Sequence, residues 1–167
     1  MPKALFINAT EVKRYSNLSG SVDSDRFLNA VYLAQRTHIQ VLLGTKLYEK
    51  LANDIVNNSL TNSYRDLLDE YVKPALIHYS LVELYPRLNY QVSNKGIYKH
   101  NSENATSISQ QELDDMVERE RVAAQFYADR FIDFISFKTS TYPEYLSGKN
   151  GDISPIDGQT GYGIVFN

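Results

Sequence analysis

The chain has 167 residues, of which 43% are hydrophobic and 22% charged, a composition that suits a single globular domain with its own core. It has no cysteine, which excludes a disulfide framework, a thiolate metal site and a cysteine nucleophile. The formal net charge of -3 argues against bulk binding of nucleic acid. Because neither a secretory signal nor a membrane-spanning apolar run is evident, we expect a product made in the cytoplasm.

The N-terminal part of the chain predicts a short helix followed by a longer one. Asn8-Ala-Thr-Glu11 has the form of a capping box, in which the first side chain accepts a backbone hydrogen bond and the last reaches back. The helix that begins there should reach about Tyr15 before the Ser- and Gly-rich stretch 16–21. A second helix follows, and its expected inward face consists of Leu28, Val31, Tyr32, Gln35, Ile39 and Leu42.

Gly44 divides the second helix from a third. A glycine just after a helix can adopt the left-handed conformation that ends it, and Thr45 can cap the helix that follows. The third helix fades into Asn57-Asn58-Ser59. The same turn leaves a DNA-binding helix-turn-helix open as an alternative. That alternative is weak, because residues 46–54 offer lysines balanced by acidic residues and no Arg or Gln cluster suited to base edges.

A further apolar stripe runs from Tyr64 to Tyr85 and keeps its helical phase through Pro74. A proline inside a helix removes one hydrogen bond and clashes with the carbonyl four residues back, here that of Glu70. We therefore expect a kink or two abutting helices at this point. Pro86 should disturb the end of the same segment.

A turn and the longest helix come next. Asn94-Lys95-Gly96 is a strong turn signal, and the flanking runs 90–92 and 97–99 can form a small β-hairpin. A second capping box, Ser109-Gln-Gln-Glu112, begins a helix that should end near residues 138–140. Its expected inward face consists of Leu113, Met116, Val117, Ala123, Ala124, Tyr127, Phe131, Phe134 and Ile135.

These elements predict an all-α fold, a compact bundle of about four to five helices over residues 1–146 with the small hairpin attached. Five glycines fall within residues 148–163, so we expect residues 147–167 to form an extended Gly-rich C-terminal arm that becomes ordered on a partner. The end of the arm alternates like a strand and can add to an exposed sheet edge. The candidate interface residues are Asn94, Lys95, Gly96, Tyr98, Tyr162, Ile164 and Phe166.

No group of residues in the sequence indicates catalysis, a metal or a cofactor. The chain lacks a Gly-rich phosphate loop, G-x-S-x-G, H-E-x-x-H and the Glu-x-x-His of di-iron bundles. His38, His78 and His100 lie in different segments, and two adjoin apolar stripes, where a hydrogen-bonded boundary role is commoner than metal ligation. We expect no enzyme activity and no cofactor, while a small enzyme and a helical binding or regulatory domain remain open as alternatives.

Three stretches of sequence carry a family resemblance. They are Ile39-Gln-Val-Leu-Leu-Gly-Thr-Lys-Leu-Tyr-Glu-Lys-Leu51; Tyr71-Val-Lys-Pro-Ala-Leu76 with Tyr85-Pro-Arg-Leu88 and Asn94-Lys-Gly-Ile97; and Phe126-Tyr-Ala-Asp-Arg-Phe131 with Tyr142-Pro-Glu-Tyr-Leu146. Together they resemble the head-tail connector, or adaptor ring, proteins of tailed bacteriophages, including the ring proteins of crAss-like phages. The resemblance spans about residues 8–146 and rests on structural motifs, not catalytic ones.

The resemblance implies a helical subunit of a dodecameric ring in the neck of the virion. Such a ring docks on the portal protein, receives other neck or tail proteins, and lets DNA pass through its lumen without sequence-specific binding. No membrane is involved. Because a ring needs two different complementary surfaces on each subunit, we expect the polar pieces 92–108 and 147–167 to supply them.

Overall fold

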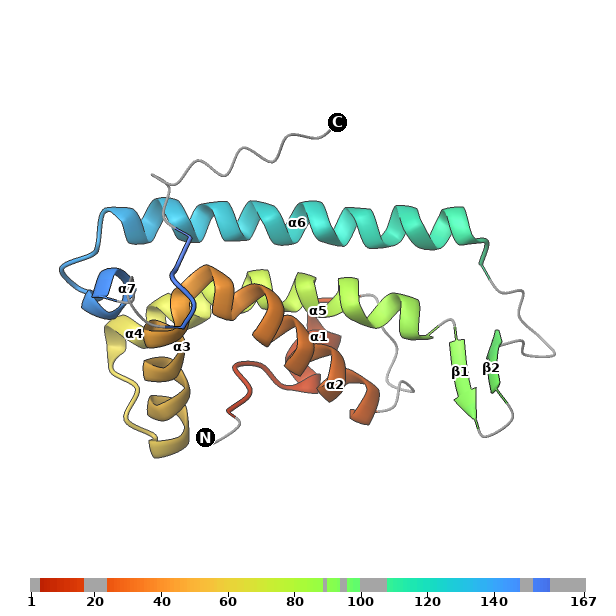
Figure 1. Cartoon of the computed structure of the whole chain (residues 1–167), viewed down its shortest axis with the longest axis horizontal. Helices are drawn as coiled ribbons and strands as arrows, with labels where there is room; N and C mark the ends of the chain where they lie inside the picture. Colours follow the sequence, from red (N-terminus) through yellow and green to blue (C-terminus); the bar gives the residue numbers. More distant parts are fainter. Residues whose placement is uncertain are drawn as a thin grey trace.

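The computed structural model describes residues 4–16, 24–88, 90–93, 96–99, 108–147 and 152–156. Apart from one short hairpin this part of the chain is helical, which confirms the predicted all-α bundle (Figure 1). No helix within these ranges is long and apolar enough to cross a membrane. The elements in chain order are α1 (Ala9–Arg14), α2 (Ser24–Ala34), a π-helical turn (Gln35–Ile39), α3 (Gln40–Asn57), α4 (Asn62–Leu67), a second π-helical turn (Leu68–Val72), α5 (Lys73–Leu88), β1 (Tyr90–Ser93), β2 (Gly96–Lys99), α6 (Gln110–Ser136) and α7 (Pro143–Ser147).

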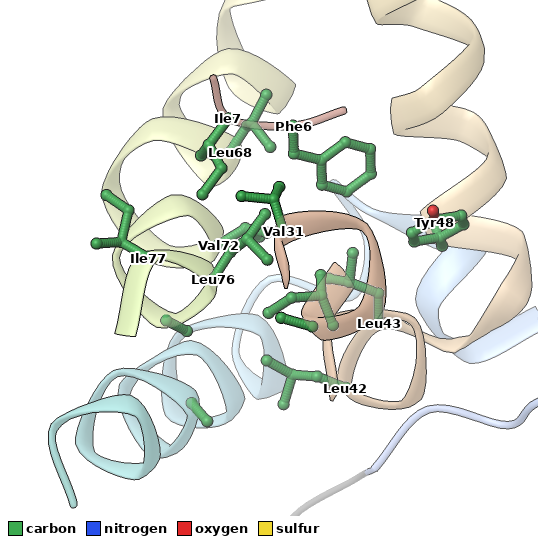
Figure 2. Close-up of a cluster of buried hydrophobic side chains, with 14 of the residues drawn as sticks. Phe6, Ile7, Val31, Leu42, Leu43, Tyr48, Leu68, Val72, Leu76 and Ile77 are labelled. Carbon is green, nitrogen blue, oxygen red and sulfur yellow. The ribbon is translucent and has the colours of Figure 1, made fainter. Parts of the chain in front are cut away.

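Helix α5 lies at the centre of the bundle. The long helix α6 packs along one side of α5, while α2 packs against another and α1 lies nearby (Figure 1). Side chains from distant segments meet in the core, and Figure 2 shows Phe6, Val31, Leu43, Val72 and Leu76 pointing toward one another. Each large apolar side chain buried in this way contributes roughly 1.5–3 kcal/mol to folding. The core therefore depends on α5 being covered from more than one direction.

A buried glutamine holds the N-terminal segment against this core. Gln35 lies in the first π-helical turn and is almost completely buried. Its Oε1 accepts a hydrogen bond from the Phe6 backbone N–H at 2.8 Å, and its Nε2 donates to the Ala4 carbonyl at 2.8 Å and the Tyr48 hydroxyl at 2.9 Å. The amide thus satisfies two backbone groups that neither a helix nor a sheet serves.

Both predicted capping boxes are present. The Asn8 side chain accepts from the Glu11 N–H at 2.9 Å, and the Asn8 N–H donates to the Glu11 carboxylate at 2.8 Å. Ser109 and Glu112 are paired in the same reciprocal way at the start of α6. Hydrogen bonds from the Ser109 backbone N–H and hydroxyl lower the pKa of the Glu112 carboxyl below its ordinary value.

Pro74 is accommodated without a break in the helix. The predicted kink or helix junction is replaced by the π-helical turn Leu68–Val72, and the helical path continues from there through α5. Pro74 has no N–H, so the carbonyl of Glu70 lacks its usual donor within the helix. This carbonyl instead accepts a hydrogen bond from Arg130 Nη1 of α6 at 3.3 Å. The Arg130 guanidinium also lies 4.8 Å from the centre of the Tyr71 ring. A side chain of α6 therefore compensates the defect in its neighbouring helix.

Gly44 forms a sharp corner within α3. Its φ of 72° confirms the predicted positive value, but its ψ of 158° lies outside the left-handed helical region. This combination is open to glycine and strained for other residues. A Cβ added at Gly44 would lie 2.7 Å from Cδ of Pro155 and 2.8 Å from its nitrogen. Both the backbone angle and the close approach of Pro155 therefore require glycine.

The described part of the C-terminal arm corrects a prediction. The sequence predicts that residues 147–167 are ordered only on a partner, whereas residues 152–156 pack on the Gly44 corner of their own chain. The Thr45 N–H donates to the Ile153 carbonyl at 2.9 Å, and the Ile153 N–H donates to Thr45 Oγ1 at 3.1 Å. The Tyr145 hydroxyl donates to the Ile156 carbonyl, and Pro155 is buried. Residues 148–151 and 157–167 lie outside the described residues.

The small hairpin is present where it was predicted. Strands β1 and β2 pair antiparallel, with Tyr90 opposite Lys99 and Ser93 opposite Gly96. The turn residues Asn94 and Lys95 lie outside the described residues. The hairpin follows α5 directly and marks one end of the bundle (Figure 1).

We predict that Gly44→Ala lowers the free energy of unfolding by roughly 1–3 kcal/mol, because alanine is strained at this φ and its Cβ meets Pro155. Urea unfolding of the full chain measures the loss. In the Pro155→Gly background the penalty should shrink in part, since the ring carbons that the Cβ meets are gone while the backbone nitrogen of residue 155 remains. An equal penalty in both backgrounds would contradict a contribution of the proline ring and leave backbone strain and the contact with the backbone nitrogen as the causes.

A second prediction concerns the buried amide. Gln35→Leu should lower the free energy of unfolding by about 1–3 kcal/mol, because it leaves the Phe6 N–H and Ala4 carbonyl buried without partners. Gln125→Leu on the exposed face of α6 is the matched control and should change stability by about 0.5 kcal/mol or less. Equal effects of the two substitutions in urea unfolding would contradict this role for Gln35.

Candidate functional site

His38 and His78 each pair with a different carboxylate, and His100 lies outside the described residues. Among the residues that the structure describes, no three His, Cys, Asp or Glu side chains are grouped to hold a metal ion. His78 Nδ1 lies 2.7 Å from Glu120 Oε2 and so joins α5 to α6. His38 Nε2 lies 3.7 Å from Glu83 Oε1 and joins the first π-helical turn to α5. His38 and His78 thus each lie between two helical elements with one carboxylate partner.

The surroundings of His38 favour its neutral form. Burial lowers the pKa of His38 below its ordinary value, Glu83 opposes this shift, and Arg121 adds to it. The imidazole also stacks on the Tyr79 ring, with 4.1 Å between ring centres. The half-buried imidazole is thereby held between the first π-helical turn and α5.

The structure places only part of the predicted interface. Gly96 and Tyr98 lie on β2, where they pair with Ser93 and Gln91 of β1. The other predicted interface residues lie outside the described residues; they are Asn94, Lys95, Tyr162, Ile164 and Phe166. The hairpin and the arm therefore stay predicted contact regions, and the described helices supply two further surfaces.

The first of these surfaces is the outward side of α6. Val122 and Phe126 are each 62% exposed although both are large and apolar. They lie four residues apart and so share one face of the helix, together with Arg119, Asp129 and Asp133. We call these five residues the α6 outer face. Two exposed apolar side chains one helical turn apart can serve as anchors when a helix packs into a groove of a partner.

The second surface is a hollow at the N-terminal side of the bundle. It encloses about 490 Å³ and includes Leu28 of α2, which is 39% exposed. Its lining also includes Leu5, Ile7, Leu60, Arg65 and Leu68, and no residue of α6 contributes to it. We call it the Leu28 hollow. Tyr32, one helical turn after Leu28, is 40% exposed beside it.

An ion pair network closes one side of the Leu28 hollow. Lys73 Nζ lies 2.8 Å from Asp69 Oδ1 and 3.0 Å from Glu11 Oε1, and all three residues line the hollow. Burial alone would lower the pKa of Lys73, but the hydrogen bonds to Asp69 and Glu11 outweigh it and raise the pKa. The two ion pairs of Lys73 join α1 to the start of α5 and hold this side of the hollow in place.

Sequence periodicity missed both surfaces. It predicts Leu28, Tyr32 and Met116 on inward faces, whereas all three are substantially exposed. It leaves Val122 and Phe126 out of the inward face of α6. The only signal of their exposure in the sequence is that they are apolar residues outside the helical spacing of that face. The predicted inward positions Val31, Ile39 and Phe131 are buried as expected.

The corner at Gly44 does not present a free recognition helix. Thr45, the first residue after the corner, bonds to residues 152 and 153 of the C-terminal segment. Lys46 Nζ donates to the Ser147 carbonyl at 2.7 Å, and Lys50 pairs with Asp54. Because these groups are engaged within the chain, the arrangement argues against the helix-turn-helix alternative.

Comparison with protein families gives one match. The family described as "Family of unknown function (DUF6712)" matches residues 39–155, which is more than half of the chain. The chain belongs to this family. The DUF6712 match begins in the first π-helical turn, takes in α3 to α7, and ends at Pro155, the residue that packs on Gly44. No curated protein and no solved structure matches this DUF6712 chain.

The pKa of His38 generates a testable pH dependence. Since the folded chain holds this pKa below its unfolded value, stability is fully present above pH ~6.5 and is lost as the pH falls through the folded pKa. We predict that melting temperature falls more between pH 7.5 and about 5.5 in the natural chain than in His38→Gln. Parallel pH profiles of the two proteins would contradict this role for His38.

Proposed function

We propose that this protein is a structural subunit of a head-tail connector ring in a tailed bacteriophage, docked on the portal and linking capsid to tail. The observation that supports it best is a pair of unlike surfaces on one helical body, each with exposed apolar side chains among charged ones. The α6 outer face and the Leu28 hollow have no residue in common. A subunit of a closed ring needs two such unlike surfaces.

The motifs that resemble connector proteins occupy the parts of the fold that hold these surfaces in place. Residues 39–51 form the Gly44 corner, residues 71–76 and 85–88 include the two ends of the central helix, and residues 126–131 lie in α6. Glycine and proline in these motifs meet specific packing needs, at Gly44 beside Pro155 and at Pro74 beside Arg130. The resemblance thus falls on residues that a rigid assembly unit requires.

A ring of this kind works by its shape and by its contacts with other virion proteins. Its subunits would present the hairpin and residues 157–167 as additional contact regions for the portal and for other neck or tail proteins. DNA would pass through the lumen without a base-reading element. The net charge of -3 agrees with a lumen wall that does not bind the DNA duplex tightly.

Electron microscopy of the purified full chain mixed with the portal protein of the same phage tests this proposal. We predict closed rings of this chain seated coaxially on the portal, and co-purification of the two proteins. A stable one-to-one complex with a protein that is not part of the virion, and no binding to the portal, would contradict the proposal and favour a regulatory domain.

A further inference from the structure

The C-terminal segment, residues 152–156, contacts the Gly44 corner through its backbone. The Thr45 N–H donates to the Ile153 carbonyl at 2.9 Å, and the Ile153 N–H donates to Thr45 Oγ1 at 3.1 Å. One residue of the corner thus offers a donor and an acceptor to one residue of the segment. N–H groups at the start of a helical stretch need acceptors from outside it, and the segment supplies one here.

The Thr45 hydroxyl uses its full hydrogen-bonding capacity at this contact, since a hydroxyl donates one hydrogen bond and accepts two. It donates to Asp152 Oδ2 at 3.1 Å and accepts from the Ile153 N–H. It also accepts from Nε2 of Gln40 at 3.2 Å. Gln40 is only 3% exposed, and its Nε2 can donate but not accept. The buried amide therefore orients the hydroxyl so that its proton points to the Asp152 carboxylate.

The side chains of the segment alternate between exposed and covered positions. Asp152 and Ser154 are exposed, whereas Pro155 is buried. The Cδ and the nitrogen of Pro155 lie 2.7 and 2.8 Å from the point that a Cβ at Gly44 would occupy. The missing side chain of Gly44 thus leaves space for a proline ring at one position of the segment.

The corner therefore contacts a specific pattern of groups. A carboxylate comes first, a backbone N–H and carbonyl come from the next residue, and a proline ring follows two residues later. A hydrogen bond from the Tyr145 hydroxyl to the Ile156 carbonyl holds the far end. Main-chain hydrogen bonds combined with spaces for alternate side chains are a common mode of peptide recognition. Both the corner and Pro155 fall within the DUF6712 match, residues 39–155.

We propose that the Gly44 corner is a binding site for a short peptide of the pattern Asp-Ile-x-Pro, and that the C-terminal segment of a second copy occupies it once the chain's own segment has left. A second copy carries in its residues 152–156 every group that the corner contacts in the structure. Exchange of an identical element between copies requires no new complementarity. This inference goes beyond the connector proposal and does not depend on it.

Fluorescence anisotropy with a labelled peptide of residues 150–158 tests the site in the full chain. In the Asp152→Ala, Pro155→Gly double variant the chain's own segment lacks two of its contact groups, while the corner is unchanged. This variant should bind the peptide at least about tenfold more tightly than the natural chain, whose own segment competes at high effective concentration. A peptide with the same two substitutions should bind at least about tenfold more weakly than the natural peptide.

Two substitutions at Thr45, each added to the double variant, form a matched pair. Thr45→Val removes the hydroxyl and should weaken peptide binding by about tenfold or more, whereas Thr45→Ser keeps the hydroxyl and should retain binding. Circular dichroism checks that each protein keeps its helical fold. Peptide binding that Thr45→Val leaves unchanged, or no peptide binding to the double variant itself, would overturn the site.

Capture of one full-length variant by another tests the second copy as the source of the peptide. A tagged double variant should capture the untagged Thr45→Val single variant, whose segment is intact, at least about tenfold more than it captures an untagged copy of itself. An excess of the natural peptide should release the captured chain. Equal capture of the two untagged chains would overturn the second copy as the occupant, since any association through other surfaces is common to both.

Discussion

Burial of α5 by helices on more than one side is the constraint on which the rest of the structure depends. Because α2 and α6 cover different sides of this helix, each turns its own outward side to solvent (Figure 1). The Pro74 defect within the covered segment is tolerated because Arg130 of α6 serves the Glu70 carbonyl. The packing that closes the core thus also produces the two surfaces on which the proposed assembly rests.

The Gly44 corner links this core to the C-terminal segment. Pro155 occupies space that any side chain at position 44 would fill, and Thr45 exchanges hydrogen bonds with Ile153. Residues 152–156 are thereby anchored on the helical body of their own chain. In a connector subunit, this anchor would reduce the freedom of the C-terminal residues that follow it, and so favour their contact with the next component of the neck.

The sequence predicts local features well and distant contacts poorly. Both capping boxes, the positive φ of Gly44 and the small hairpin depend on a few neighbouring residues, and all are present. The roles of Gln35 and Pro155 depend on partners about 30 and more than 100 residues away, and periodicity cannot identify them. The exposure of Leu28 and Phe126 likewise follows from where whole helices pack, because apolar spacing alone does not distinguish core from interface.

Oxidative cross-linking tests most directly whether the α6 outer face and the Leu28 hollow are the two ring surfaces of the proposed connector subunit, because the natural chain has no cysteine to interfere. The two positions, Leu28 and Phe126, lie on different sides of one molecule, so a disulfide between introduced cysteines has to join two copies with Cα atoms within roughly 7 Å. The account predicts that the Leu28→Cys, Phe126→Cys double variant forms a ladder of covalent oligomers, while each single variant forms no covalent oligomer. Covalent dimers of Phe126→Cys alone, or no oligomers from the double variant, would contradict it.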